Sequence, residues 1–298
     1  MLIHMHSHPQ EPARAVVLGS AGFIGGTITQ SLRASGISTL PLSRVEMDLL
    51  SPTAADALAA LLQPSDVLVV ASANAPCKDL AMLRGNLTMI DPVCAALQRT
   101  PVAQVVYISS DAVYKDSTSP ITEASCAEPN SLHGVMHLAR EVALRQAYAG
   151  PLALVRPTLV YGLNDPHNGY GPNRFRRLAA QGQDIVLFGE GEERRDHVDV
   201  QDVADLVLHI VRRRSAGVAN AVSGQVVSFR ELAEFAASAF LPQVRVHGST
   251  RLGAMPHNGY RAFDNRALCA ALPGLHFKHW QEGLTQVHQQ QVAVEASK

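Results

Sequence analysis

Two histidines lie four residues apart in SLHGVMHLARE (residues 131–141), a segment whose pattern predicts a helix. His133 and His137 would therefore share one helical face. Imidazole changes its charge near neutral pH, so His133 could act as a general acid or base and His137 could hydrogen-bond a ligand.

The same spacing leaves two other interpretations open. Two helical histidines can share a zinc ion if a third ligand exists, and the conceivable ones are Asp111, Glu123 and Cys126. Zinc sites usually carry more recognisable ligands than this, so we expect no metal. The third interpretation is two histidines without a chemical role.

A glycine-rich turn, GSAGFIG (residues 19–25), follows an apolar run and opens a predicted helix. Gly19 would allow the tight turn, Gly22 would let the backbone approach a pyrophosphate, and Gly25 would permit close packing of helix on sheet. The start of the helix would offer free N–H groups to the phosphates. This strand–turn–helix context predicts a dinucleotide site.

The end of the second predicted strand bears on the choice of dinucleotide. An acidic residue there would favour NAD, but the sequence has Ser43 and Arg44. The Arg44 guanidinium could accept the 2′-phosphate of NADP, or Arg44 could simply be a surface charge. Both NAD and NADP stay open.

The elements that must position these residues alternate through the first half of the chain. Strands are predicted at 13–19, 37–42, 66–72, 104–110 and 152–158, and helices at 23–36, 53–63, 83–98 and across the two histidines. Nearly continuous apolar strands separated by helices predict an α/β fold with a doubly wound parallel sheet. Ligands bind beyond the carboxyl ends of such strands, which places residues 19–25, 71–73, 109–111 and 157–158 around one crevice.

Composition narrows the class of protein. The chain has 298 residues, 47% of them hydrophobic, and a net charge of −1, which suits one large domain or two intimate ones and argues against nucleic acid as a partner. No apolar stretch is long enough for a membrane helix, and the start lacks a secretory signal. The four cysteines form no CxxC pair, so we expect a cytoplasmic protein. Residues 1–13, with three histidines, are predicted to be a flexible tail.

Further motifs extend over nearly the whole chain. They are Asp48-Leu49, Asn86 in RGNLTMID, YISSDAVY (107–114), RPTLVYG (156–162), VLFGEGEERRDHVDVQDVADLV (186–207), FDN (263–265) and EGL (282–284). Together with the glycine turn, they resemble an extended short-chain dehydrogenase/reductase of the NAD-dependent epimerase/dehydratase family, whose members act on nucleotide sugars.

The resemblance implies a Rossmann-type dinucleotide-binding domain at 14–163, to which residues 192–220 return, and a smaller, interleaved substrate-binding part at 164–191 and 221–298. It also implies that a homodimer can form through helices flanking the sheet. The residues assigned to the cofactor are Gly19, Ser20, Gly22, Phe23, Ile24, Gly25, Ser43, Arg44, Asp48, Leu49, Ala71, Ser72, Ala73, Asn86, Ser109, His137 and Pro157. Those assigned to the substrate are Asp111, Thr158, Phe188 and Arg195. Arg195 would pair with diphosphate oxygens, or would instead form an ion pair between domains.

The catalytic centre departs from the family pattern. Members use a Ser or Thr with Tyr and Lys in a YxxxK helix, and Ser110 matches the first of these. His133 stands at the tyrosine and His137 at the lysine, while Leu159 replaces a common Asn. His137 could not reproduce a permanently charged lysine at neutral pH.

We therefore expect altered redox chemistry on a nucleotide sugar or related polyol: epimerisation, dehydration or carbonyl reduction. Ser110 would polarise the reacting oxygen, His133 would be the acid/base, and His137 would position NAD or NADP. The alternative is a catalytically silent sensor that binds the dinucleotide and turns over nothing.

Overall fold

A seven-stranded sheet forms the centre of the computed structural model, which describes residues 2–240 and 244–296. Strand order is β1 (Ile3–His4), β10 (Ser215–Ala221), β6 (Leu152–Pro157), β5 (Gln104–Ile108), β4 (Asp66–Val70), β2 (Arg14–Leu18) and β3 (Thr39–Leu42). All neighbouring strands are parallel except β1, which runs antiparallel to β10. The predicted doubly wound α/β fold is confirmed.

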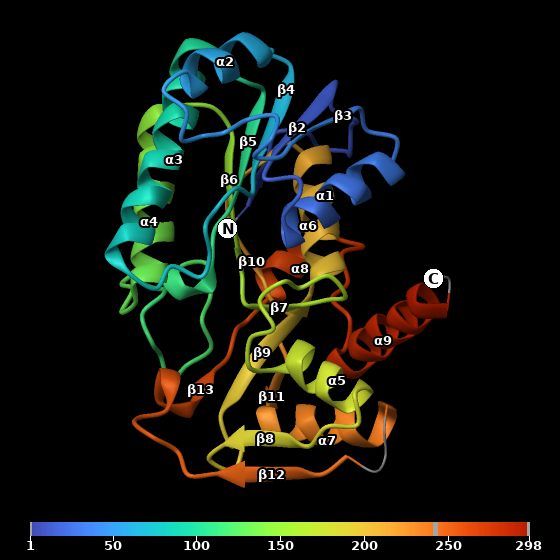
Figure 1. The fold of residues 1–298 in the computed structure, drawn as a ribbon. Helices are drawn as coiled ribbons and strands as arrows, with labels where there is room; N and C mark the ends of the chain where they lie inside the picture. The colour runs from blue at the N-terminus through green and yellow to red at the C-terminus, as the bar shows by residue number, and fades with distance from the viewer. Residues whose placement is uncertain (1, 241–243, 297–298) are drawn as a thin grey trace.

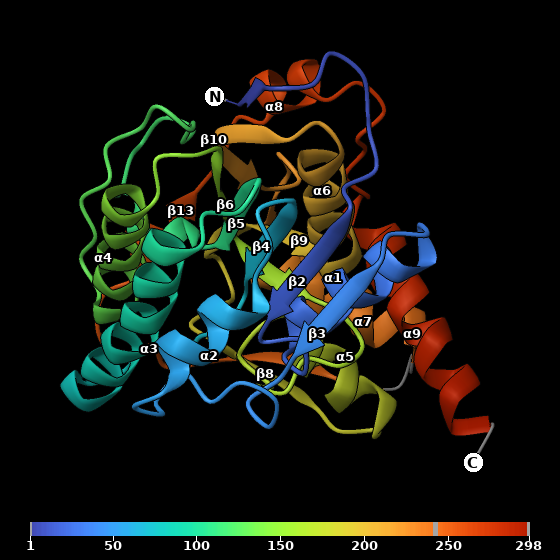
Figure 2. The ribbon, with the colours of Figure 1, turned by 90° about the horizontal axis from the view of Figure 1, so that it is seen from above.

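Helices cover both faces of this sheet (Figures 1 and 2). One face carries α2 (Ala54–Leu61), α3 (Leu80–Arg99) and α4 (Leu132–Ala147), and the other carries α1 (Phe23–Ala34) and α6 (Val200–Arg212). Both faces of β2 are buried in separate apolar cores, with Val17 in one and Val16 in the other. Burial on both faces explains why the strands read as continuous apolar runs.

A smaller part lies below the carboxyl ends of the central strands in Figure 1. It contains β7 (Leu159–Tyr161), β8 (Ile185–Phe188), β9 (Arg194–Asp199), β11 (Val226–Ser228), β12 (Val246–Ser249), β13 (Tyr260–Arg261), α5 (Pro172–Ala180), α7 (Phe229–Phe240) and α9 (Trp280–Ala296). Its apolar core includes Phe175, Leu187 and Phe229. The short α8 (Arg266–Ala271) packs back against the central domain through Leu268.

The boundary between the two parts runs along β7 and β9. These strands pair with each other, and β9 also pairs with β11 and β13, so neither belongs to the central sheet. Val160 and Val198 nevertheless pack against the apolar core of the central domain, and the assignment of residues 192–220 to that domain stays a prediction.

The expected flexible tail is partly ordered. Ile3 and His4 pair with Ala216 and Ser215 at the edge of the central sheet. The His4 ring also contacts Ser215 Oγ at 2.7 Å and the Ala271 carbonyl oxygen at 2.8 Å. Backbone pairing and two side-chain hydrogen bonds hold this segment, so the prediction was wrong for these residues.

Candidate functional site

The glycine turn between β2 and α1 has a geometry that excludes side chains. Gly19 has φ +85°, and a Cβ there would come 2.7 Å from the Ser72 nitrogen. A Cβ on Gly25 would lie 2.2 Å from the Gly19 oxygen. Helix α1 starts after Gly22 with no side-chain cap and no acidic residue in its first turn. Its free N–H groups therefore suit a pyrophosphate, and the turn fits a dinucleotide.

Replacing Gly25 with Ala is expected to push α1 away from the turn. The new methyl would overlap a backbone oxygen that cannot rotate aside, so we expect a loss of about 1–3 kcal/mol in unfolding free energy, together with weaker dinucleotide binding. Urea unfolding measures the first effect and calorimetric titration the second. Gly85→Ala is the stability control, because a Cβ in α3 at that position meets nothing within 4 Å. Equal stability of the two variants would contradict the packing argument.

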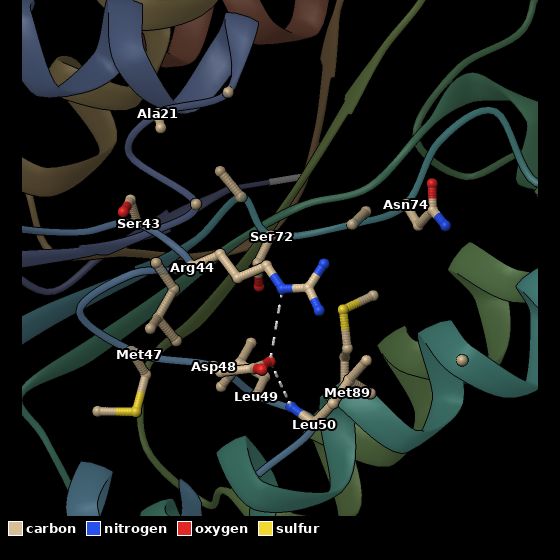
Figure 3. A pocket seen from close by; sticks show the side chains of 16 residues that line it. Ala21, Ser43, Arg44, Met47, Asp48, Leu49, Leu50, Ser72, Asn74 and Met89 are labelled. Atoms are coloured by element: carbon tan, nitrogen blue, oxygen red, sulfur yellow. Dashed lines mark hydrogen bonds and ion pairs between the residues drawn. The ribbon is translucent and has the colours of Figure 1, made fainter.

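A first cavity of about 420 Å³ opens beside this turn (Figure 3). Its lining includes Gly19, Gly22, Ser43, Arg44, Asp48, Leu49, Ala71, Ser72 and Ala73, which the sequence assigned to the cofactor. The Arg44 side chain is 80% exposed and its Nε lies 3.8 Å from Asp48 Oδ1, which also accepts from the Leu50 nitrogen at 3.1 Å. A weak, exposed ion pair leaves the guanidinium available to a ligand phosphate.

A second cavity of about 570 Å³ shares Gly22, Ala71 and Ala73 with the first. The predicted site residues that line it are Phe23, Ile24, Gly25, Ser109, Ser110, Asp111, His133, His137, Pro157, Thr158 and Arg195. The structure thus brings the glycine turn, the two histidines and most of the expected substrate contacts around two adjoining spaces.

His133 lies at the wall of the second cavity. Its Nδ1 accepts a hydrogen bond from the Cys77 nitrogen at 3.3 Å. Burial lowers the pKa of His133 from its ordinary value, although Asp111 opposes this shift. Because Nδ1 is an acceptor, the neutral ring carries its proton on Nε2. His133 therefore presents a hydrogen-bond donor.

His137 is almost completely buried, with 4% of its surface exposed. Its ring packs edge-on to His133 with centroids 4.7 Å apart, and its Nδ1 lies 2.8 Å from the Tyr107 hydroxyl. Burial lowers the pKa of His137 well below its ordinary value, and His133 and Arg140 act in the same direction. The ring is therefore neutral at neutral pH.

The two serines after β5 have different partners. Ser109 Oγ donates to Glu141 Oε1 at 2.6 Å, whereas Ser110 Oγ accepts from the Ala112 nitrogen at 3.1 Å. Among the described residues, the Ser110 hydroxyl donates only one long hydrogen bond, of 3.5 Å to Asp111 Oδ1, so its proton stays available to a ligand. This suits hydrogen bonding to a substrate oxygen.

Asp111 is held by an arginine from the smaller part of the protein. Arg261 Nε donates to Asp111 Oδ2 at 3.0 Å and its Nη2 donates to the Asp111 carbonyl at 2.6 Å. Arg261 Nη1 also donates to Asp116 Oδ1 at 2.8 Å. The loop that follows Ser110 is therefore fixed across the boundary between the two parts.

Arg195 and Thr158 use some of their polar atoms within the protein. Arg195 Nη1 donates to Glu193 at 3.2 Å, while its buried Nε has no partner among the described residues. Thr158 Oγ1 donates to the Asp196 carbonyl at 3.2 Å. Arg195 thus combines a local ion pair with an unused donor, which leaves both of its expected roles open.

Three assigned residues lie elsewhere than expected. Asn86 is fully buried and bonds the Asn74 nitrogen at 2.8 Å and the Asn74 oxygen at 2.9 Å, so it shapes the loop beside the cofactor cavity and its amide is not free to touch a ligand. Phe188 stacks on Tyr170 with centroids 4.5 Å apart, is 54% exposed, and lines neither cavity. Ser20 also lines neither cavity, and its backbone nitrogen donates to Leu42.

Sequence reasoning missed several cavity residues. His257 comes from a short turn, Pro256–Gly259, has φ +52°, and pairs with Asp116. His167 and the cis peptide Ala75–Pro76 also line the second cavity. His167, His257 and the Ala75–Pro76 peptide belong to none of the motifs recognised in the sequence, so no signal marked them as site residues.

The metal interpretation finds no support in the described ranges 2–240 and 244–296. No three His, Cys, Asp or Glu side chains there are arranged to hold an ion. In the same ranges, no helix combines the length and apolar character needed to cross a bilayer.

The fold is that of a Rossmann-type dinucleotide-binding protein, and comparison with known proteins identifies its family. A model of the NAD dependent epimerase/dehydratase family matches residues 15–223, and the chain belongs to this family. Its cofactor class is accordingly NAD or NADP.

Named relatives are similar over most of the chain. GDP-L-fucose synthase 1 of Arabidopsis thaliana is 27% identical over 255 residues, covering 76% of this chain and 78% of the relative. A dTDP-4-dehydro-6-deoxy-D-allose reductase of Streptomyces bikiniensis is 26% identical over 265 residues, covering 73% and 78%.

Solved structures share the fold. UDP-glucose 4-epimerase of Thermus thermophilus in complex with NAD superposes with a TM-score of 0.79 at 21% identity, covering 93% of this chain and 98% of the other. A GDP-L-fucose synthetase of Naegleria fowleri bound to NADP gives 0.79 at 17% identity, covering 95% and 94%.

Proposed function

We propose that the protein is an NADPH-dependent reductase that acts on a carbonyl group of a nucleotide sugar. The observation that carries this proposal is the second cavity, where Ser110, His133 and His137 adjoin the glycine turn. Relatives that span most of the chain, named as a GDP-L-fucose synthase and a sugar-nucleotide reductase, support it.

The state of His133 favours reduction over the other family reactions. Epimerisation or dehydration that begins with oxidation needs a base to take a hydroxyl proton. His133 Nδ1 is occupied by the Cys77 nitrogen, so the neutral ring offers an N–H and no free lone pair. A carbonyl oxygen is the natural partner of this donor and of the Ser110 hydroxyl.

The chain's residues have separate tasks in this reaction. A dinucleotide held at the glycine turn would supply the hydride for the carbonyl carbon. Ser110 and His133 would donate hydrogen bonds to the oxygen and stabilise the negative charge that develops there, and solvent would supply the proton that completes the hydroxyl group. His137 holds a ribose hydroxyl, and Arg195 pairs with the diphosphate of the substrate.

Arg44 supports NADP as the preferred dinucleotide. It lines the first cavity with Ser43 at the end of β3, and its pairing with Asp48 is weak. We expect Arg44→Ala to weaken NADPH binding about tenfold or more and to leave NADH binding unchanged. Calorimetric titrations of both dinucleotides check this, with the exposed Arg266→Ala as control. Equal losses for both dinucleotides would remove Arg44 from phosphate recognition.

Turnover of keto-sugar nucleotides with NADPH tests the whole proposal. Oxidation of NADPH by at least one member of a panel is expected. A silent sensor is the second candidate, because the family's Tyr and Lys are replaced by His133 and His137. NADPH binding without any turnover would favour the sensor, and absence of binding would overturn both proposals.

A further inference from the structure

Two buried residues whose roles have not been described, Tyr107 and Arg140, lie next to His137. Tyr107 in β5 is 1% exposed, and its hydroxyl lies 2.8 Å from His137 Nδ1. Arg140, one turn along α4, is fully buried and stands over the Tyr107 ring, 5.3 Å from its centroid. Its Nη2 donates to the Ser72 carbonyl at 2.7 Å.

Arg140 is a buried cation without a neighbouring carboxylate to neutralise it in the described part of the chain. In the ranges that the structure describes, no ion pair joins it to a carboxylate, and its Nε has no hydrogen-bond partner. Glu141, its neighbour in sequence, pairs with Arg156. A fixed positive charge therefore lies directly beside Tyr107 and His137, and it disfavours a second positive charge on the imidazole.

The direction of the Tyr107–His137 hydrogen bond follows from these surroundings. Burial raises the pKa of Tyr107 to about 12 and lowers that of His137, so the phenol keeps its proton and the imidazole is neutral. If Nδ1–H were the donor, the buried phenol O–H would have no acceptor among the described residues. The phenol therefore donates, and the imidazole proton sits on Nε2.

We propose that Tyr107 is a positioning residue that fixes His137 as the neutral Nε2–H tautomer and turns this N–H towards the second cavity, while Arg140 carries the positive charge of this site one helical turn away. The acceptor is a hydroxyl group of the ligand. Only its identification as a ribose hydroxyl of the dinucleotide rests on the proposed function.

Nitrogen-15 NMR tests the tautomer without cofactor or turnover. In protein labelled at histidine, long-range proton–nitrogen correlations distinguish the two neutral tautomers and the cation, and the His137 signals are those lost in His137→Gln. The expected wild-type result is the Nε2–H pattern, constant between about pH 6 and 8. An Nδ1–H pattern or a cation in that range would overturn the proposal.

Tyr107→Phe tests the cause. Without the phenol donor, the His137 signals should move towards a mixture of tautomers, and the dissociation constant for NADPH should rise about fivefold, as expected for a weakened neutral hydrogen bond. Unchanged His137 signals in this variant would overturn the role of Tyr107.

Tyr148→Phe is the matched control. Tyr148 is also buried in this domain, its hydroxyl donates to the Val102 carbonyl at 2.9 Å, and neither residue lines either of the two cavities. Tyr148→Phe should lower the free energy of unfolding by about as much as Tyr107→Phe does. It should leave the His137 signals and NADPH binding as in the wild type. Because the tautomer is measured on the free protein, failure of NADPH to bind would count against the proposed function alone.

Discussion

Replacement of His133 by Phe is expected to lower kcat/KM for carbonyl reduction by about 100-fold or more, with NADPH affinity nearly unchanged. The ring would keep its packing against His137 but lose the Nε2–H that we propose as a donor to the carbonyl oxygen. Loss of one donor that stabilises a developing negative charge typically costs a factor of about 100 to 1000. Steady-state kinetics with a keto-sugar nucleotide that the protein reduces measure kcat/KM. Calorimetric titration measures the NADPH affinity separately.

The pH profile provides the control. Burial lowers the pKa of His133, so the ring is mostly neutral at pH 7. It gains a proton only at a pH below the ordinary pKa of imidazole. Since the imidazolium is the stronger donor, reduction should become faster as pH falls through this lowered pKa. His133→Asn keeps an N–H donor that does not titrate, so it should retain part of the rate and lose this pH dependence. The same profile in both proteins would exclude His133 from proton donation.

Arg156→Leu is expected to cost about 3–5 kcal/mol of unfolding free energy. Arg156 Nε and Nη2 bond both oxygens of the fully buried Glu141, at 2.9 and 2.6 Å. The arginine also stacks over the Tyr114 ring at 4.7 Å. Leucine would leave the carboxylate buried with only Ser109 and the more distant Arg145, 3.9 Å away. Urea unfolding measures the loss.

The double variant Glu141→Met/Arg156→Leu separates charge from packing. Removing both charges leaves no uncompensated ion, so the double variant should be more stable than Arg156→Leu alone. If the double variant were the less stable of the two, the cost would come from lost packing, and the buried-charge explanation would fail.

The parts of the site that were predictable depend on short-range rules. Gly19, Gly22 and Gly25 lie within one turn between a strand and a helix, where backbone sterics demand glycine at fixed spacing. His133 and His137 share a helical face by geometry alone. The crevice at the carboxyl ends of the strands follows from the parallel sheet.

The remaining features depend on tertiary packing that the sequence pattern does not reveal. In the sequence, Tyr107 is indistinguishable from the apolar residues of its strand. Its hydroxyl meets His137 only because α4 packs over β5. Asn86 was assigned to the cofactor because it matched a motif. In the structure its side-chain amide forms hydrogen bonds with the backbone of Asn74, in the 71–76 loop. β7 and β9 lie next to central elements in sequence, yet they pair with each other in the smaller sheet.

The contacts of Arg261 have a consequence for how the chain can be divided. The family match ends at residue 223, whereas the guanidinium that neutralises Asp111 and Asp116 comes from residue 261. Phe263 also bridges to Ile121. A fragment cut at the end of the match would lose the arginine that pairs with Asp111, which lines the second cavity, and with Asp116. We therefore expect a fragment that ends at residue 223 to be less stable than the whole chain, because the contacts of Arg261 and Phe263 would be missing.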